Sequence, residues 1–383
     1  MLLPTIRAGV PTRSKAVYHA VRFLAHDPMV YLTVPTGDRV RRILIVRDVE
    51  LERARKLPTA DKVYCPADFA PPEGLSGDRE IATAQAAAVC VTRHGIRRVL
   101  ADRSLPLVFA EHLKEAGVEV VLDLDLGVTD RRRKDETEVA ALRQAQQDTE
   151  TAIALACRII RHANARADGV LMHDGEVLTS ERVKAIIDQH LAKLGYGNDG
   201  HIIAGGPIGA DCHHAGAGEL RTGEPVLVDV FPQNKTTLYH GDCTRTVVHG
   251  DVPPLVQKMH DIVAEAKKAA EGATRAGTTG DAVHRATAAV MEKHGVYLGF
   301  LPSDAPANQL FLPHGTGHGL GLDLKEPPLL DYKGVELLAG DAVTIEPALY
   351  AHGIGGVRLE DMYIVRDNGY ENLDTLPETL TEW

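Results

Sequence analysis

The chain has 383 residues, of which 44% are hydrophobic and 25% charged, and its formal net charge is −11. Two domains are expected at this length, and the acidic balance argues against nucleic-acid binding, which needs a concentrated basic face. Neither the N-terminal stretch nor any later window has the apolar run of a signal peptide or a membrane span, so no membrane association is expected.

The first part of the chain alternates strand-like and helix-like segments. Strand patterns occur at 30–34, 42–46, 62–65, 98–101 and 118–122, and helical patterns at 50–56, 81–94 and 108–116. This alternation predicts a three-layer α/β domain with a mostly parallel sheet. No glycine-rich loop follows any of these strands, so a nucleotide site is not expected here.

A polar segment, residues 127–135, separates this part from the remainder, and we expect domains at 1–127 and 128–383. Helices are predicted from about Thr137, at 180–194 with Ser180 as N-cap, from 253–254 to about 276, and at 281–294. Glycines follow three of them and act as stop signals. The segments between and after these helices read as strands, so the second domain is predicted to be α+β with an antiparallel sheet.

Residues 226–246 read as a β-hairpin that carries Asp229 on one arm and Asp242 on the other. If the turn closes at residues 235–236, the two aspartates are cross-strand partners, with Cβ atoms ~5 Å apart. Metal ions in dinuclear sites lie ~3.5–4 Å apart, so this pair could hold two of them. Without a cation the carboxylates would repel and one would keep its proton. The alternative, that both are surface residues beside a turn, stays open from this segment alone.

Three histidines are candidates. His213 belongs to a pair of adjacent histidines behind a short apolar strand. Glycines at 315, 317, 319 and 321 exclude a stable helix around His314 and His318, which on an extended chain share a face but lie ~13 Å apart. We therefore expect one of them to be a ligand and the other to reach the substrate. A flexible glycine loop with incidental histidines is the alternative.

Two carboxylates complete the set. Glu346 ends a strand at the point where Pro347 stops the ladder, and Glu360 shares a strand face with Arg358. A glutamate directed into a pocket needs a partner such as a metal ion or that arginine, whereas two salt bridges at the rim are the alternative. Several carboxylates and one imidazole form a hard donor set suited to Mn²⁺, Co²⁺, Fe²⁺ or Zn²⁺, with the oxygen content favouring Mn²⁺. Two such ions are suited to hydrolysis.

The five cysteines are odd in number and have no CxxC spacing, which fits free thiols in a reducing cytoplasm. Cys212 and Cys243 each adjoin a candidate site residue. They are either ligands or small packing residues, and the spacing favours packing.

Five motifs resemble, in order and spacing, the pita-bread metallopeptidases, the family of methionine aminopeptidase, aminopeptidase P and prolidase. They are Asp229 and residues 242–246, 314–323, 344–347 and 355–361. The likeness covers roughly residues 135 to 370. The N-terminal domain resembles, by length and pattern, the creatinase-type domain of aminopeptidase P and prolidase. The resemblance implies a catalytic domain with a curved antiparallel sheet.

The same resemblance implies the roles of the site residues. Two divalent metal ions would be held by five ligands: Asp229, Asp242, His318, Glu346 and Glu360. Asp242 and Glu360 would bridge the ions, and Glu346 would also act as acid and base for the nucleophilic water. His314 would donate a hydrogen bond to the substrate or intermediate. His213 would flank the substrate pocket, and Arg358 would orient the ligands.

Two departures from the family pattern stand out. Asp229 and Asp242 are two residues further apart than usual, and an even insertion keeps them opposed across the hairpin. Lys325 stands where the family has a second catalytic histidine. A lysine has three donors and no acceptor, so it can polarise an oxyanion or hold a carboxylate but cannot act as a neutral imidazole. This departure does not affect the predicted metal ligands, but it leaves open whether the protein hydrolyses Xaa-Pro bonds.

The sequence thus predicts a cytoplasmic, homodimeric, dinuclear metallopeptidase that hydrolyses Xaa-Pro bonds of short peptides by attack of a metal-bridging hydroxide, as a dipeptidase or aminopeptidase P does. Mn²⁺ is favoured over Co²⁺, Zn²⁺ or Fe²⁺. Because of Lys325, an amidohydrolase acting on another small amide is the first alternative. A non-catalytic binding protein of the same fold is the second, although such proteins have generally lost ligands and all five are present here.

Overall fold

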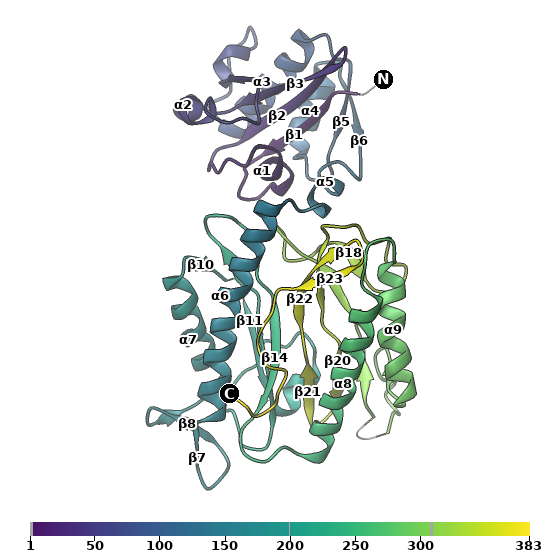
Figure 1. Ribbon diagram of the computed structural model, residues 1–383. Coiled ribbons are helices and arrows are strands. Elements are labelled where there is room, and N and C mark those ends of the chain that lie inside the picture. The colour runs from purple at the N-terminus through teal and green to yellow at the C-terminus, as the bar shows by residue number, and fades with distance from the viewer. Residues whose placement is uncertain (1–2, 199, 307–308) are drawn as a thin grey trace. The chain divides into compact units, whose positions relative to one another are not determined.

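The computed structural model describes residues 3–198, 200–306 and 309–383. The chain divides into two compact units, Met1–Arg131 and Arg132–Trp383 (Figure 1). This division lies close to the expected limit at residue 127. Within the described ranges, none of the helices combines the length and the apolar character that crossing a bilayer requires.

The N-terminal unit contains one mixed sheet in the order β4-β3-β2-β1-β5-β6. Its strands are β1 Thr5–Gly9, β2 Met29–Thr36, β3 Arg39–Ile45, β4 Lys62–Tyr64, β5 Arg98–Ala101 and β6 Glu119–Leu122. Three pairings are parallel, β1–β5, β3–β4 and β5–β6. The pairings β1–β2 and β2–β3 are antiparallel, the latter because only Gly37 and Asp38 join the two strands, too few for a parallel crossover.

Helices cover both faces of this sheet. They are α1 Lys15–Val21, α2 Leu51–Ala54, α3 Arg79–Arg93, α4 Leu107–Glu115 and, at the end of the unit, α5 Thr129–Arg132, with 3₁₀ turns η1 Asp48–Glu50 and η2 Pro66–Phe69. Alternate residues of β2 enter different cores: Val30 packs with α3 and α4, and Tyr31 with α1 and α2. The predicted three-layer α/β arrangement is therefore confirmed, since successive strand residues point to opposite faces.

Four long helices occur in the second unit where the sequence predicts them. They are α6 Glu136–Arg161, α7 Ser180–Lys193, α8 Pro254–Ala273 and α9 Gly280–Lys293. Asp135 and Glu138 form a capping box that begins α6. The predicted N-cap Ser180 is wrong by one position, because the Thr179 side chain accepts the hydrogen bond from the Arg182 backbone.

The strands of this unit form three sheets around the site and two small ones. The sheets are β11-β12-β14, β15-β16-β20-β21 and β18-β17-β19-β22-β23, with β10-β13 and β7-β8-β9 apart. Their bounds are β7 Asn164–Ala165, β8 Leu171–His173, β9 Glu176–Val177, β10 Tyr196–Gly197, β11 His201–Gly205, β12 Pro225–Val230, β13 Gln233–Asn234, β14 Cys243–Val248, β15 Tyr297–Leu298, β16 Phe311–Leu312, β17 Gly317–Gly319, β18 Glu326–Leu330, β19 Ala342–Ile345, β20 Ala348–Ala351, β21 Gly355–Arg358, β22 Asp361–Arg366 and β23 Gly369–Asn372; η3 spans Gly206–Ala210. Apart from β15–β16, the described pairings here are antiparallel, as predicted.

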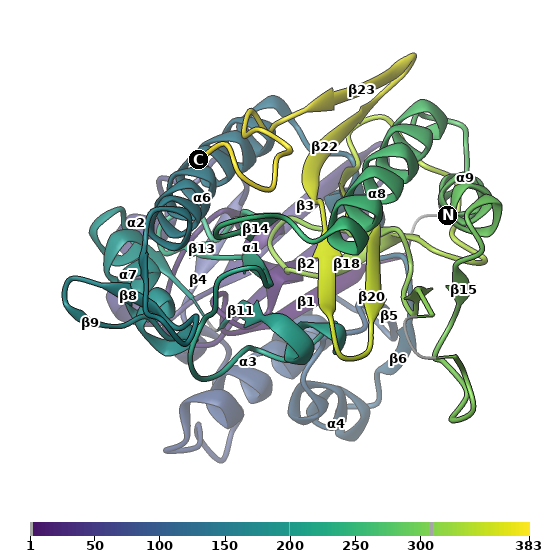
Figure 2. The same ribbon diagram turned by 90° about the horizontal axis from the view of Figure 1, so that it is seen from below.

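Two helix pairs cover these sheets. Helices α6 and α7 pack on β11, β12 and β14, whereas α8 packs on β20 and β21 and α9 on β18. Figures 1 and 2 show the two pairs apart from each other, each beside its own strands. Along β12, Val226, Val228 and Val230 enter the core under α6 and α7, and Asp229 points to the other face. The predicted alternation of this strand is therefore confirmed.

The predicted hairpin register is wrong. Asp229 pairs with Thr244, and Asp242 precedes β14. The two strands are not joined by the predicted tight turn at residues 235–236. The Asn234 side chain accepts hydrogen bonds from the Thr236 and Thr237 backbones, and the turn that it stabilises lies further along the chain. Since Asp242 is two positions from Thr244, it keeps the same face as Asp229, and the two carboxylates are diagonal neighbours.

Candidate metal centre

The residues predicted to form the site line one cavity of about 320 Å³ in the second unit. They are Asp229, Asp242, His318, Glu346, Glu360, His213, His314, Lys325 and Arg358. Most of these residues come from both arms of the β12–β14 hairpin, from β17 and from the ends of β18, β19, β21 and β22. His213 follows η3, and His314 lies between β16 and β17. Residues separated by more than a hundred positions therefore converge on one space.

Three buried side chains form the closest group. Asp242, His318 and Glu360 each offer a ligand atom, and these atoms lie within 4.8 Å of one another. The Nε2 atom of His318 is 3.7 Å from Oδ2 of Asp242 and 3.6 Å from Oε1 of Glu346. Glu346 therefore adjoins the group.

Asp229 completes the set from the opposite strand. Its Oδ2 accepts a hydrogen bond of 2.6 Å from Arg358, while its Oδ1 is buried without a hydrogen-bond partner among the described residues. A buried carboxylate oxygen left without a partner is costly. A metal ion would satisfy this oxygen, so the donor set fits the predicted centre.

The orientation of His318 also fits a ligand. Its Nδ1 is 3.1 Å from the carbonyl oxygen of Gly319, which can only accept, so Nδ1 carries the proton and Nε2 keeps its lone pair toward the carboxylates. Burial lowers the pKa of His318 to about 4, so the ring is neutral at pH 7.

Burial and mutual repulsion act on the carboxylates. Burial raises the pKa of Asp242 and of Glu360 well above its usual range, and neighbouring carboxylates raise it further. Burial likewise raises the pKa of Glu346 to about 7, although Arg358 opposes this rise. Both effects favour the protonated carboxyl groups in the absence of a cation.

The metal-free protein should lose stability as pH rises from about 4.5 to 7, because native Glu346 keeps its proton in this range and the unfolded chain has released it. Glu346 should contribute a fall in the free energy of unfolding of at most about 1.4 kcal/mol per pH unit, and Asp242 and Glu360, whose pKa is also raised, should add to it. Urea denaturation of chelator-treated protein at pH 5, 6 and 7 measures this slope. Glu346→Gln should make the slope shallower, and an equally steep slope in that variant would contradict the assignment.

Gln146, on α6, holds the backbone of Asp242. Its Nε2 donates to the Asp242 carbonyl at 2.8 Å, and its Oε1 accepts from the Asp242 amide at 2.8 Å. This polar residue lies on the buried face of α6 and was not predicted as part of the site. The sequence places Gln146 on the apolar face of the helix. Because a buried amide needs hydrogen-bond partners, this position could have indicated a structural role.

Gln146→Leu should weaken metal binding about 10- to 100-fold, the usual cost of losing a residue that positions a ligand. Gln147→Leu is the matched control, because Gln147 is the exposed neighbour on the same helix. Metal affinity is measured by calorimetric titration, and circular dichroism checks folding. Equal metal affinity in both variants would show that the hydrogen bonds from Gln146 are not needed to position Asp242.

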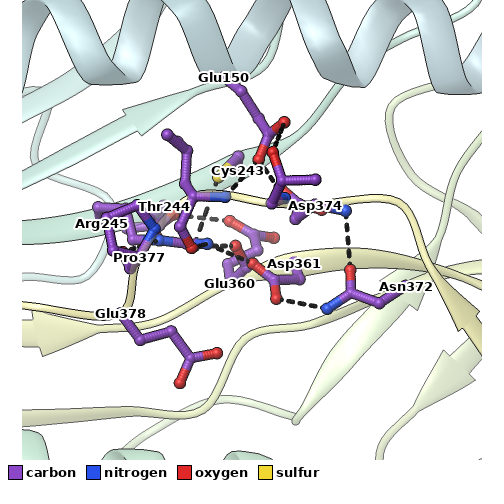
Figure 3. Close-up of polar contacts among 12 residues, drawn as sticks. Glu150, Cys243, Thr244, Arg245, Glu360, Asp361, Asn372, Asp374, Pro377 and Glu378 are labelled. Atoms are coloured by element: carbon purple, nitrogen blue, oxygen red, sulfur yellow. Dashed lines mark hydrogen bonds and ion pairs between the residues drawn. The ribbon is translucent and has the colours of Figure 1, made fainter.

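Arg245 organises the back of the centre (Figure 3). Its fully buried guanidinium donates to the Glu360 carbonyl at 2.8 Å, to Asp361 at 2.7 Å and to the carbonyls of Leu376 and Pro377 at 3.1 Å. Thr244 donates to Oε2 of Glu360 at 2.6 Å. The residues after Asp242 therefore hold Glu360 in place.

Neither candidate cysteine joins the close group of ligands. The Cys243 thiol is buried beside Arg245, whose guanidinium donates to its sulfur, and burial raises the pKa of the thiol well above its usual range. Cys212 lines the cavity, and burial also raises the pKa of its thiol. These surroundings favour packing over metal binding for both.

His314 belongs to a chain of hydrogen bonds that ends at Arg358. Its Nδ1 donates to the Gly315 carbonyl at 2.8 Å, and its Nε2 lies 2.9 Å from the Tyr350 hydroxyl, which accepts from Arg358 at 2.7 Å. Tyr350 therefore donates to His314, whose two ring nitrogens are both engaged. To donate to a substrate, the ring would have to exchange one of these contacts.

Tyr350 was not predicted as part of the site. It is fully buried within the apolar run of β20, where a tyrosine hydroxyl needs a polar partner, and this is the signal that could have found it. His213 and Lys325, in contrast, are exposed residues at the cavity wall.

Comparisons with known proteins agree with this arrangement. The model of metallopeptidase family M24 matches residues 140–367. A probable dipeptidase PepE of Mycobacterium tuberculosis is 31% identical over 72% of this chain and 68% of its own length. An Xaa-Pro dipeptidase of Pyrococcus horikoshii is 28% identical over 73% of each chain.

A solved structure matches nearly the whole chain. The Xaa-Pro dipeptidase of Bacillus anthracis superposes with a TM-score of 0.78, at 24% identity, over 98% of this chain and 94% of that chain. At this identity the match shows the fold, and it extends through both units.

Proposed function

Because the chain belongs to metallopeptidase family M24, we propose that it hydrolyses the Xaa-Pro bond of short peptides, in the manner of a dipeptidase or aminopeptidase P. The pita-bread family and fold predicted from the five motifs are confirmed. The observation that carries the proposal is the convergence of Asp229, Asp242, His318, Glu346 and Glu360 on one cavity wall. Relatives named as Xaa-Pro dipeptidases support the substrate class.

These five residues would hold two divalent ions. Ions bound there would lower the pKa of a water molecule and polarise the scissile carbonyl. Glu346 would hold and pass on the proton of the attacking water, because its carboxylate lies in the same cavity, beside His318. Arg358 would keep Asp229 in position, and His213 would flank the substrate at the rim.

Further parts of the proposal concern metal, location and assembly. Four carboxylates beside one imidazole support Mn²⁺ over Co²⁺, Zn²⁺ or Fe²⁺. All five cysteines are free, which supports a reducing cytoplasm. By the family resemblance the enzyme would be a homodimer, with a creatinase-type domain at 1–127 and a catalytic domain at 128–383.

The test is a screen of protein loaded with Mn²⁺ or Co²⁺ on Xaa-Pro, Xaa-Pro-Yaa and Met-Xaa peptides. Metal-dependent release of proline from Xaa-Pro supports the proposal. Absence of both hydrolysis and bound metal refutes it, and leaves a non-catalytic binding protein as the better account.

Lys325 favours one second candidate, an amidohydrolase that acts on another small amide, because it lines the cavity where the family has a histidine. The variant Lys325→His separates the two. If Xaa-Pro peptides are the native substrates, the variant should hydrolyse them no faster than the wild type. A large gain of Xaa-Pro hydrolysis would favour the second candidate.

A further inference from the structure

Lys325 is a cation on the cavity wall without a hydrogen-bond or ion-pair partner among the residues that the structure describes. It directly precedes β18, and its side chain is exposed. Within the described ranges its ammonium makes no hydrogen bond and no ion pair. It lines the same cavity as Asp242 and Glu346 and forms no ion pair with either carboxylate.

The other cations nearby are already paired. Arg358 donates to Asp229 and to Tyr350. Lys134, at the beginning of the second unit, makes a buried ion pair of 2.6 Å with Glu326, the residue next to Lys325. This pair engages the carboxylate next to Lys325 in the chain, and the Lys325 side chain stays available.

We propose that Lys325 determines specificity by binding the free carboxylate of the residue that follows the scissile bond, so that the enzyme prefers dipeptides to blocked or longer peptides. The inference rests on the proposed Xaa-Pro peptidase function. It assigns to this lysine a contact with substrate.

The chemistry of a dipeptide fits this position. In Xaa-Pro the carboxylate carbon is separated from the scissile carbonyl by one nitrogen and one α-carbon, and so lies within about 4 Å of it. Each further residue moves the terminal carboxylate outward by about 3.3–3.6 Å, and an amide removes its charge. A lysine ammonium is a compact point charge on a flexible stem, suited to a single carboxylate at the edge of a pocket.

Two other roles for Lys325 predict different behaviour. If it stabilised the oxyanion of the intermediate, its loss would lower kcat equally for free and blocked substrates. If it only offset the repulsion among the carboxylates, its loss would weaken metal binding. Neither role gives a preference for a free carboxylate.

The test compares Xaa-Pro with the matched amide Xaa-Pro-NH₂ for wild type, Lys325→Met and Lys325→Arg. The wild type should prefer the free acid by about 10- to 100-fold in kcat/KM, the effect of a hydrogen bond between charged groups. Lys325→Met should lose at least about ten-fold more on the acid than on the amide, through KM, while Lys325→Arg keeps most of the preference. Calorimetric titration with proline and prolinamide should show the same difference in binding.

Other results overturn the inference. An equal loss on both substrates assigns Lys325 to the oxyanion, and a fall in bound metal assigns it to support of the carboxylates. A wild type that hydrolyses acid and amide equally well refutes carboxylate recognition but leaves the proposed peptidase intact. A metal-loaded wild type that hydrolyses neither refutes the peptidase function itself.

Discussion

Asp242→Ala should abolish metal binding and peptidase activity together. The carboxylate is buried in the closest group of ligands, and its Oδ2 faces Nε2 of His318 at 3.7 Å. By the proposal it would help to hold the two ions, so its loss would weaken their binding and remove several kcal/mol of stabilisation of the transition state. We expect kcat/KM to fall by about 10³-fold or more. Elemental analysis of bound metal and proline release from Xaa-Pro measure the two effects.

Loss of the fold would give the same activity result, so stability must be measured as well. Asp242→Asn keeps the volume of the side chain and removes the buried charge. Since burial and repulsion raise the pKa of Asp242 in the native protein, its carboxyl group lowers the stability of metal-free wild type at pH 7, and the metal-free Asn variant should be more stable than metal-free wild type. Thermal unfolding in the presence of a chelator measures this comparison.

The matched control is Asp331→Asn. Asp331 also lines the cavity, but 45% of its side chain is exposed and it lies outside the close group. This variant should keep the wild-type metal content. Full metal content and activity in Asp242→Ala would contradict the proposed centre.

Glu346→Gln should lower kcat about 10²- to 10⁴-fold with a smaller change in KM, because it removes the group that moves the proton of the attacking water. The Glu346 backbone amide donates to the Thr316 carbonyl at 2.7 Å, so its position at the end of β19 should persist in the variant. Steady-state kinetics on Xaa-Pro, with bound metal measured in parallel, separate loss of proton transfer from loss of a ligand.

Glu336→Gln, at an exposed glutamate of the same unit, is the control for this second prediction. It should leave kcat within the error of the wild type. If Glu346→Gln turned over at a rate close to the wild type, another residue would have to accept the proton, and the assigned role would be wrong.

Much of the fold could be predicted from local patterns in the amino-acid sequence. The long helices of the second unit lie close to their predicted positions, because apolar periodicity and capping residues act within a few turns of the chain. Strand β1 was missed, since Thr5–Gly9 is short and includes Arg7 and a glycine. Its centre is buried between two neighbouring strands, and that burial is a tertiary effect.

In the candidate site, too, some features could be predicted from local sequence and others depend on tertiary contacts. Its carboxylates and histidines could be named from residue type, spacing and resemblance. The contacts of Gln146, Arg245 and Tyr350 could not be predicted, because each joins residues far apart in the chain. A polar residue within an apolar run marks Gln146 and Tyr350 as candidates but does not identify their partners. The hairpin register was wrong for a related reason: Asn234 moved the turn by hydrogen bonds that alternation along the strands does not predict.

The amino-acid sequence by itself determined the family, the ligand types and the faces that carry them, because side-chain period and donor chemistry are local properties. The tertiary structure alone decided the register of Asp229 against Thr244, the hydrogen bonds that occupy His314, and the absence of a partner for Lys325 among the described residues. These features depend on which distant segments pack together, and packing is set by the whole chain and not by any one stretch of it.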